Sequence, residues 1–387
     1  MLSGEKMNKS YLIKDGTLWS PCMEERETKD ILITDGIIQA IENNIKAEQN
    51  VKVLHADGMF LMPGWIDGHA HVYNQNEAIG IDADSMISSG VTCVVDAGTT
   101  GAYNFQDFKT NIIDQSQIMV KALLHIAKWG VNGKYGELRD MSQIDMPACL
   151  EMCAQYPEDI LGLKVRIDGR VCSNEELAMK KLRDMGDRAG KPIVVHASRS
   201  SLPLEEILSY LKKGDIFAHT FSDKKPGILN KNGVIKEAAI DAKRRGVIFD
   251  LSHGNGNFSF DIARTAMNQG FFADMISTDL HKGSRDIVKS LSLTMTKMLH
   301  LGLSLEDVIC YVTEKPAQIL NIGEKSLKIK TGAAADIVGF KLQEGEFMLT
   351  DSSGKTEHAE KQIVTCFTLI KHNLYIQDPT AETELAD

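Results

Sequence analysis

The stretch "LMPGWIDGHAHV", residues 61–72, places two histidines one residue apart behind a Pro-Gly step and an Asp-Gly pair. Alternate side chains of an extended strand point to the same face, so Asp67, His69 and His71 would share one face. Two imidazoles on one face can begin a metal site, but zinc and related ions need three or more protein ligands. The remaining ligands must therefore come from distant parts of the chain.

Short apolar runs alternate with segments of helical periodicity between residues 60 and 282. The eight runs span residues 59–71, 91–98, 120–130, 160–167, 191–198, 215–222, 246–254 and 274–281. Most are apolar on both faces, as is typical of parallel strands covered on each side. This alternation favours a (β/α)8 TIM barrel over an open doubly wound sheet, since no glycine-rich nucleotide loop follows the first strand.

Two of the intervening segments carry clear helix signals. Residues 173–190, "SNEELAMKKLRDMGDRAG", predict a helix that Ser173 caps and Gly190 ends. Residues 236–246 predict a second helix.

The two ends of the chain differ from its middle. Residues 11–20 and 29–45 read as short strands joined by Asp-Gly turns, and residues 332–342 and 365–376 again read as strands. We therefore expect a small β-sandwich domain built from both termini. Its predicted bounds are residues 1–62 and 325–387, with the barrel of residues 63–324 inserted, a return crossing at 326–336 and a frayed acidic tail at 378–387.

Composition sets limits on function. The chain has 387 residues, 43% hydrophobic and 25% charged, which is typical of a soluble globular protein. Its formal charge of −10 argues against broad binding to nucleic acid or anionic membranes. Neither a leader-like apolar segment nor a membrane-spanning run is present, which predicts a cytoplasmic protein.

Cysteine usage agrees with that location. The seven cysteines, at positions 22, 93, 149, 153, 172, 310 and 366, are odd in number and scattered. This indicates reduced thiols rather than a disulfide framework. Cys149 and Cys153 could approach on a helix, where two partly buried thiols are favoured over a redox or metal pair.

Polar side chains stand near the ends of five predicted strands. They are His69, His71, Lys164, His196, His219 and Asp279. The carboxyl ends of barrel strands meet at one mouth, so these side chains should converge there. Each has a structural alternative: a hydrogen-bonded core histidine, a lysine that reaches solvent, or an aspartate that caps a helix. Those explanations would have to coincide six times.

The order H-x-H, Lys, His, His, Asp resembles the amidohydrolase superfamily, in its branch with two metals and a carboxylated lysine. "PGWIDGHAH" and "GAAADIVGF" are also similar to that family, and the resemblance covers nearly the whole chain. It implies that His69, His71 and Asp279 bind the more buried ion, and that His196 and His219 bind the more exposed one. It also implies that Lys164, as N6-carboxylysine, bridges two divalent ions. Zn2+ is favoured by these ligands, with Mn2+, Fe2+ and Co2+ as alternatives.

The resemblance also implies a mechanism. A metal-bridging hydroxide would attack the substrate carbonyl, and Asp279 would act as general base and then as general acid. Asp67 is a candidate outer partner that orients an imidazole, with a plain turn residue as the equal alternative.

Several departures from the motifs of related families narrow the range of predicted substrates. Dihydroorotases resemble this pattern but carry an arginine where Tyr73 stands, and their last strand reads D-x-A-P-H where this chain has "DLHKG". Deaminase relatives carry H-x-x-E on strand five, where this chain has "HASR". The segments "LGLKVRI", "FAHTFS" and "DLSHGNGNFSF" instead resemble a smaller group, labelled dihydroorotase-like or adenine-deaminase-like. That group includes deacetylases that cleave acetyl esters of α-hydroxy acids.

We therefore predict a deacetylase or amidohydrolase that cleaves an acyl ester or amide of a small carboxylic acid. A cyclic amidohydrolase or β-aspartyl-type dipeptidase is the alternative, with adenine deaminase less favoured and a non-catalytic scaffold disfavoured because all six ligands are present. Candidate substrate contacts are Arg166, Arg170, His253 and Asn255. The alternative for each is a structural role in loop solvation or capping. A homo-oligomer is compatible with the sequence, but no diagnostic patch marks one.

Overall fold

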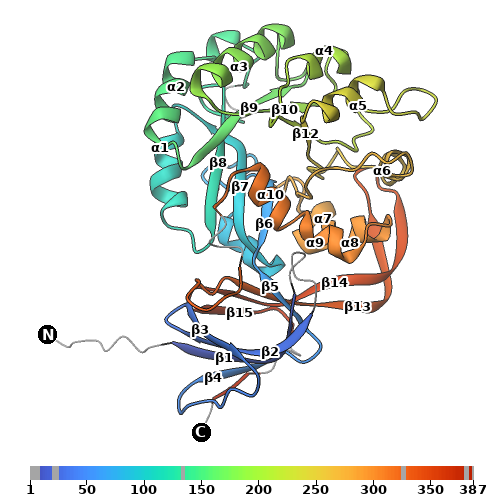
Figure 1. The fold of residues 1–387 in the computed structure, drawn as a ribbon. Coiled ribbons are helices and arrows are strands. Elements are labelled where there is room, and N and C mark those ends of the chain that lie inside the picture. The colour runs from blue at the N-terminus through green and yellow to red at the C-terminus, as the bar shows by residue number, and fades with distance from the viewer. Residues whose placement is uncertain (1–8, 20–25, 132–135, 324–327, 379–382, 386–387) are drawn as a thin grey trace, which may run out of the picture.

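Two β-sheets organise the chain, as the computed structural model in Figure 1 shows. The structure describes residues 9–19, 26–131, 136–323, 328–378 and 383–385. Cys22, the first two residues of the predicted return crossing and most of the predicted frayed tail lie outside these residues. One sheet is parallel and has helices packed around it, and the other contains strands from both ends of the chain.

The parallel sheet has seven strands, whose spatial order follows the chain. They are β6 (Trp65–Ala70), β7 (Val91–Gly101), β8 (Met119–His125), β9 (Ile160–Ile167), β10 (Ile193–Ala197), β11 (Ile216–Ala218) and β12 (Ile248–Phe249). Parallel neighbours need crossover connections, and here these pass over the outside of a curled sheet. The result is the α/β class that the alternating pattern predicted.

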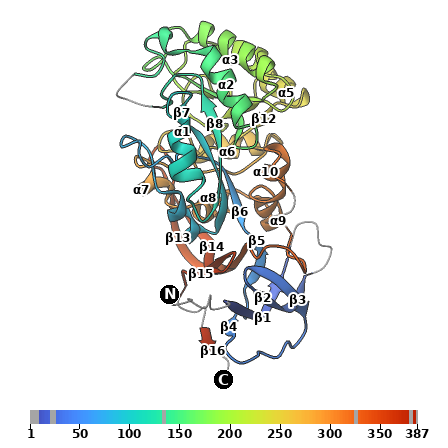
Figure 2. The same cartoon turned by 90° about the vertical axis from the view of Figure 1, so that its left-hand side faces the viewer.

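Helices provide the outer layer, which Figures 1 and 2 show from two sides. The α-helices are α1 (Phe105–Phe108), α2 (Met146–Gln155), α3 (Glu175–Ala189), α4 (Leu204–Ser209), α5 (Glu237–Arg244), α6 (Phe260–Met267), α7 (Arg285–Val288), α8 (Leu291–His300), α9 (Leu305–Cys310) and α10 (Glu314–Ile319). Three short turns of other helix types are η1 (Ala83–Ser89), η2 (Lys109–Ile113) and η3 (Met141–Gln143). Among the described residues, no helix combines the length and apolar character needed to span a membrane.

Residues 274–281, the predicted eighth strand, do not form a continuous strand in the structure. It makes single parallel bridges on both sides, from Met275 to Asp250 and from Leu280 to Ala70. The segment therefore lies between the two edges of the curled sheet. Asp279 has φ 48°, a left-handed value that interrupts strand geometry at this point.

The predicted first strand, residues 59–71, is two strands in two different sheets. β5 (Phe60–Pro63) pairs with strands of the second sheet, and β6 begins at Trp65 in the parallel sheet. Gly64 alone separates them. A Cβ at Gly64 would lie 2.0 Å from Oγ1 of Thr92, so only glycine allows this close crossing.

The second sheet has nine strands, in the order β15-β14-β13-β5-β1-β2-β3, with β4 beside β1 and β16 beside β4. Besides β5, they are β1 (Ser10–Leu18), β2 (Glu27–Thr34), β3 (Ile37–Glu42), β4 (Lys52–His55), β13 (Ile337–Thr350), β14 (Thr356–Ile370), β15 (Asn373–Ile376) and β16 (Thr383–Leu385). Three residues of the tail expected to fray thus pair with β4. β13 and β14 form a hairpin longer than predicted, which runs beside α8.

Local turn and cap chemistry matches the expectation only in part. Asp35 and Gly36 both have positive φ and join β2 to β3, as predicted for an Asp-Gly hairpin turn. Asp15, with φ 58°, instead lies at a register shift inside β1. The cap of α3 is Asn174, whose side chain accepts from Leu177 N, and not Ser173, while Gly190 ends the helix with φ 62° as predicted.

The main core lies between the parallel sheet and its helices, and a second core fills one side of the nine-stranded sheet. All six described cysteines are free thiols. Cys149 and Cys153 are both buried on α2, so they behave as core residues and not as a disulfide.

Candidate active site

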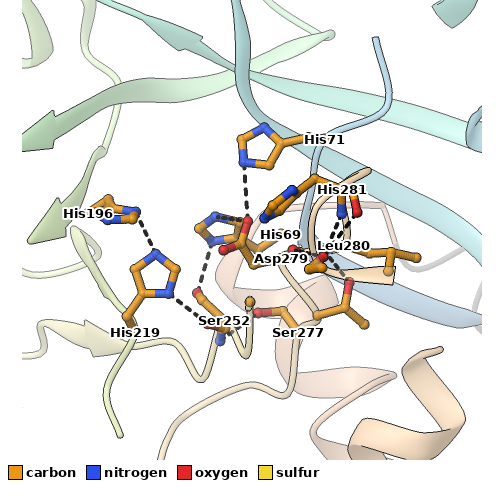
Figure 3. Close-up of polar contacts among 12 residues, drawn as sticks. His69, His71, His196, His219, Ser252, Ser277, Asp279, Leu280 and His281 are labelled. Carbon is orange, nitrogen blue, oxygen red and sulfur yellow. Dashed lines mark hydrogen bonds and ion pairs between the residues drawn. The ribbon is translucent and has the colours of Figure 1, made fainter. Parts of the chain in front are cut away.

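Six polar side chains from five distant segments converge at the carboxyl ends of the parallel strands, and Figure 3 labels all of them except Lys164. They are His69 of β6, His71 one residue after β6, Lys164 of β9, His196 of β10, His219 one residue after β11, and Asp279 of the 274–281 segment. All but His196 are buried. These are the residues that the sequence predicted as metal ligands, and the fold brings them together.

His69, His71 and Asp279 form one part of the cluster. One ligand atom from each lies within 4.8 Å of those of the other two. Oδ1 of Asp279 is 3.2 Å from Nε2 of His71 and 3.8 Å from Nε2 of His69. Two imidazole nitrogens and a carboxylate oxygen in this arrangement are a donor set that suits a divalent transition metal.

His196 and His219 form the other part. Nδ1 of His196 lies 2.6 Å from Nε2 of His219, and the ring of His219 is 5.5 Å from the ring of His69 between centroids. Lys164 lies beside the first part, with Nζ 3.3 Å from Nε2 of His69, and it lines the same cavity as His196. An ion shared by His196 and His219 would require their two nitrogens to separate.

Burial sets the charges of these groups. It lowers the pKa of His69 below its ordinary value, that of His219 to about 3 and that of Lys164 to about 8. Burial alone would raise the pKa of Asp279, but the hydrogen bond with His71 and the nearby histidines hold it well below its usual range. At neutral pH the imidazoles of His69 and His219 are therefore neutral, the carboxylate is ionised and a fraction of the lysine is uncharged.

Outer contacts aim the imidazoles inward. Nδ1 of His69 donates to Asp250, 3.1 Å away, and Nδ1 of His219 donates to the carbonyl oxygen of Ser252 at 2.7 Å. Nδ1 of His71 lies 2.8 Å from Oγ1 of Thr99. In the rings of His69 and His219, Nε2 is left with its lone pair, whereas Nε2 of His71 faces the carboxylate of Asp279, 3.2 Å away. Such outer hydrogen bonds fix the tautomer and orientation of metal-binding histidines.

Asp67 does not orient an imidazole, contrary to the hypothesis from the sequence. Its carboxylate accepts hydrogen bonds from the backbone N–H groups of His69 and Thr278, and from the Thr278 hydroxyl. It therefore joins the backbone of β6 to the 274–281 segment. Burial raises the pKa of Asp67 to about 7, against the opposing effect of these hydrogen bonds. The carboxylate that contacts the ring is Asp250, a polar residue directly after the apolar part of run 246–254.

A cavity of about 410 Å³ opens over the cluster. Its lining includes His71, Lys164, His196, Asp279 and Asn255. His281 also lines the cavity, as do three arginines, Arg166, Arg170 and Arg199. A larger cavity, of about 970 Å³, lies at the opposite ends of the strands and contains none of the predicted site residues.

The candidate substrate contacts occupy different positions. Arg170 is at the rim, paired with Asp168 through its Nε and Nη2 groups, and Asn255 donates to the carbonyl oxygen of Gly283. His253 does not line the cavity. Its buried ring stacks on Phe258, and its Nε2 lies 2.8 Å from Nζ of Lys297, so it belongs to the packing behind the site.

Sequence reasoning missed His281, which lines the cavity with its ring edge-on to His71 at 6.0 Å. Its signal was present in "DLHKG", two residues after Asp279. It also missed Glu137, a buried carboxylate that pairs with Arg166 from a loop with no motif.

This chain belongs to the amidohydrolase family, whose model matches residues 60–366, and it is therefore a hydrolase by family. It is similar to a protein named deacetylase from Enterococcus faecalis, with 32% identity over 352 residues that cover 89% of this chain and 95% of the relative. A second protein named deacetylase, from Brucella anthropi, is 31% identical over 363 residues, which cover 92% and 89% of the two chains.

Solved structures carry other names. A structure titled as an adenine deaminase matches with a TM-score of 0.85 and 31% identity, covering 95% of this chain and 100% of that one. A structure titled as a dihydroorotase matches with a TM-score of 0.87 and 29% identity, covering 95% and 99%. Relatives of about 30% identity bear three different names, so the substrate has to be argued from the cavity and not from the family alone.

Proposed function

We propose that this protein is a binuclear metal-dependent deacylase that cleaves an acyl ester or a non-peptide amide of a small carboxylic acid. The observation that carries the proposal is the convergence of imidazole nitrogens, one ionised carboxylate and one buried lysine at a single cavity floor. The two relatives named deacetylase, each matched over most of both chains, support the deacylase reaction over the alternatives.

The proposed architecture is a complete (β/α)8 barrel of residues 63–324 with a small β-domain of residues 1–62 and 325–387. The bridges from the 274–281 segment to Asp250 and Ala70 support its role as the eighth position that closes the barrel. In this arrangement the barrel supplies every proposed metal ligand, and the β-domain supplies none.

We assign His69, His71 and Asp279 to the more buried ion, and His196 and His219 to the second ion. Lys164, as N6-carboxylysine, would be a ligand of both ions. The neutral imidazoles of His69 and His219 and their inward Nε2 atoms fit Zn2+, which we expect as the metal. When bound, the two ions provide an activated water at neutral pH and polarise the substrate carbonyl.

The environment of Lys164 favours carboxylation. Burial lowers its pKa to about 8, so the neutral amine that must react is accessible near neutral pH. The Nζ lone pair forms a bond to the carbon of CO2 and one Nζ proton is released, which leaves an anionic carbamate. An ammonium at this position would repel divalent ions, whereas a carbamate supplies two oxygens and reaches farther than Asp or Glu would.

Asp279 is the proposed proton carrier. Its low pKa leaves the carboxylate ionised at neutral pH, and the side chain lines the cavity beside His71 and His196. It accepts the proton of the attacking water and delivers it to the oxygen or nitrogen of the leaving group.

A dihydroorotase-like reaction is the second candidate, favoured by the structural match to a protein with that title. The position of Tyr73 argues against it. The Tyr73 hydroxyl donates to Asp107, and the residue is buried outside the cavity lining, so it offers no cation to a substrate carboxylate. Adenine deamination is disfavoured because the fourth residue of "HASR" in the cavity is Arg199 and not an acid.

Metal analysis and a substrate panel test the proposal together. We expect close to two ions per chain and hydrolysis of O-acetyl hydroxy acids or N-acetyl amino acids by the metal-loaded protein. Cyclic amides, β-aspartyl dipeptides and adenine form the comparison set. Full activity with one tightly bound ion, or a preference for the comparison set, would contradict the assignment.

A further inference from the structure

Arg166 lies one step above the lysine on the same face of β9. β9 and β10 pair in unbroken register from Leu163 to Ile167, with Lys164 opposite Val194 and Arg166 opposite His196. Residues two apart in a regular strand share a face, and both side chains line the cavity. The guanidinium is therefore directed to the same space as the proposed metal ligands.

Glu137 holds this guanidinium from one side. Nε of Arg166 donates to Oε2 of Glu137 at 3.1 Å, and Nη2 donates to Oε1. Glu137 is only 3% exposed, so its position is fixed by packing. Among the described residues, no acceptor contacts Nη1 of Arg166. The edge formed by Nη1 and the second N–H of Nη2 remains available for a second carboxylate.

The other arginines of the cavity are less suited to bind an anion. The side chain of Arg166 is 26% exposed, whereas those of Arg170 and Arg199 are 62% and 45% exposed. Water and salt screen the more exposed charges. The three arginines face two carboxylates, those of Glu137 and Asp168, so the group keeps an excess positive charge for an anionic ligand.

We propose that Arg166 binds the carboxylate of the substrate through its free edge and so determines specificity for acids. This inference rests on the proposed deacylase function. A two-residue step of about 6.6 Å along the parallel strand separates Arg166 from Lys164. That short separation fits an acid whose acyl-bearing oxygen or nitrogen is on the α or β carbon. Ile79 and Val131 add apolar surface to the same cavity and suit an apolar substituent of the acid.

Paired substrates test this role. The pair consists of an O-acetyl 2-hydroxy acid and its methyl ester, which differ only in the charged carboxylate. For Arg166→Gln we expect kcat/KM to fall about 100-fold on the acid, since a charge-assisted bidentate pair is lost, and less than about threefold on the methyl ester. Arg166→Lys should be intermediate, because it retains charge without the planar fork.

Arg264→Gln is the matched control. Arg264 also makes a two-point pair with a carboxylate, that of Glu357, but outside the cavity. We expect its ratio of acid to ester activity to equal that of the wild type. An equal loss on both substrates in Arg166→Gln would overturn the proposal, as would an acid-specific loss in Arg170→Gln instead.

Direct binding separates this inference from the proposed function. The 2-hydroxy acid without its acetyl group has no bond to cleave, so calorimetric titration reports binding alone. We expect Arg166→Gln to bind it at least about tenfold more weakly at unchanged metal content. If the wild type hydrolyses neither substrate, the deacylase function fails, and the calorimetric comparison still decides whether Arg166 binds carboxylates. If Arg166→Gln does not fold, Arg166→Lys supplies the same comparison.

Discussion

The carboxylate of Asp250 accepts a hydrogen bond from Nδ1 of His69 across 3.1 Å, although the two residues are 181 positions apart in the chain. Ser252 and Ser277 also donate to this carboxylate. Burial would raise the pKa of Asp250, but these hydrogen bonds together keep it below its ordinary value. An ionised acceptor therefore holds His69 in the tautomer that leaves Nε2 free.

Replacement of this carboxylate should weaken metal binding. For Asp250→Asn we expect a 10- to 100-fold (order of magnitude) loss of metal affinity, measured by competition with a chelator, because the amide no longer enforces the tautomer. Asp351→Asn is the control, since Asp351 is equally buried but accepts from Phe260 N and the turn at Ser353. Equal affinities in the wild type and Asp250→Asn would show that Asp250 does not support the metal site.

Lys164 should be required for the second ion. Lys164→Ala removes the proposed bridging carbamate, so we expect the metal content to fall below two and the activity to fall at least about 100-fold. Added acetate or propionate should restore part of the activity by occupying the vacated position. A further check is reconstitution of metal-free protein with and without bicarbonate. Activity that does not depend on CO2 would argue against carboxylation.

A substitution at Gly254 tests whether the close approach of the loop after β12 to Asp279 matters for the site. A Cβ at Gly254 would lie 2.5 Å from Oδ2 of Asp279, and Gly254 has φ 56°. Gly254→Ala should therefore displace the carboxylate and lower metal affinity. Gly256→Ala, in the same loop, has open space around its Cβ and should bind metal as the wild type does. Metal titration of the two variants provides the measurement, and identical affinities would contradict the expectation.

His125 should contribute to acid sensitivity. Burial lowers its pKa to about 3, and the charges of Arg166 and Lys164 act in the same direction. The unfolded chain takes up a proton at this residue below about pH 6.5, whereas the folded chain does not until about pH 3. Stability should therefore fall as the pH falls through this window, by up to about 1.4 kcal/mol per pH unit from this group.

Urea unfolding of the wild type and His125→Gln at pH 7, 6 and 5 measures that contribution. The free energy of unfolding of His125→Gln should decline less steeply with acid, because the variant cannot take up that proton on unfolding. Parallel curves for the two proteins would contradict the expectation.

Lys297, behind the site, should contribute with the same sign as His125 but at higher pH. It is fully buried, its Nζ contacts His253 and the carbonyl oxygen of Ile287, and burial lowers its pKa to about 7. Between about pH 7 and pH 10.5 the unfolded chain binds the extra proton, so stability should rise with pH. Lys297→Met should be more favourable relative to the wild type at pH 6 than at pH 9 in denaturant unfolding. A pH-independent difference would contradict this expectation.

The sequence predicted the parallel strands well where a strand is regular and buried. Residues 160–167 were predicted as a strand and form β9 with the same bounds. The prediction failed where backbone geometry changes within an apolar run, because hydrophobic pattern does not report φ. Residues 59–71 cross between two sheets at Gly64, and residues 274–281 are interrupted at Asp279.

The convergence of the six proposed ligands was predictable, because strand order and the barrel rule place strand ends together. Their supporting contacts were not. Asp67 looked suitable because it is close to His69 in sequence, whereas Asp250 reaches the ring from 181 residues away. His253 looked suitable because it follows a strand, but its ring turns toward Lys297. Contacts of this kind depend on side-chain direction in the folded chain, which spacing along the sequence does not determine.

The single residue between β5 and β6 has a mechanical consequence. β5 of the nine-stranded sheet passes through Gly64 directly into β6, which bears His69 and precedes His71, so no longer linker absorbs motion between them. A displacement of β5 in the nine-stranded sheet would therefore reach His69 and His71 within a few peptide units, so changes in that sheet should shift the two imidazoles.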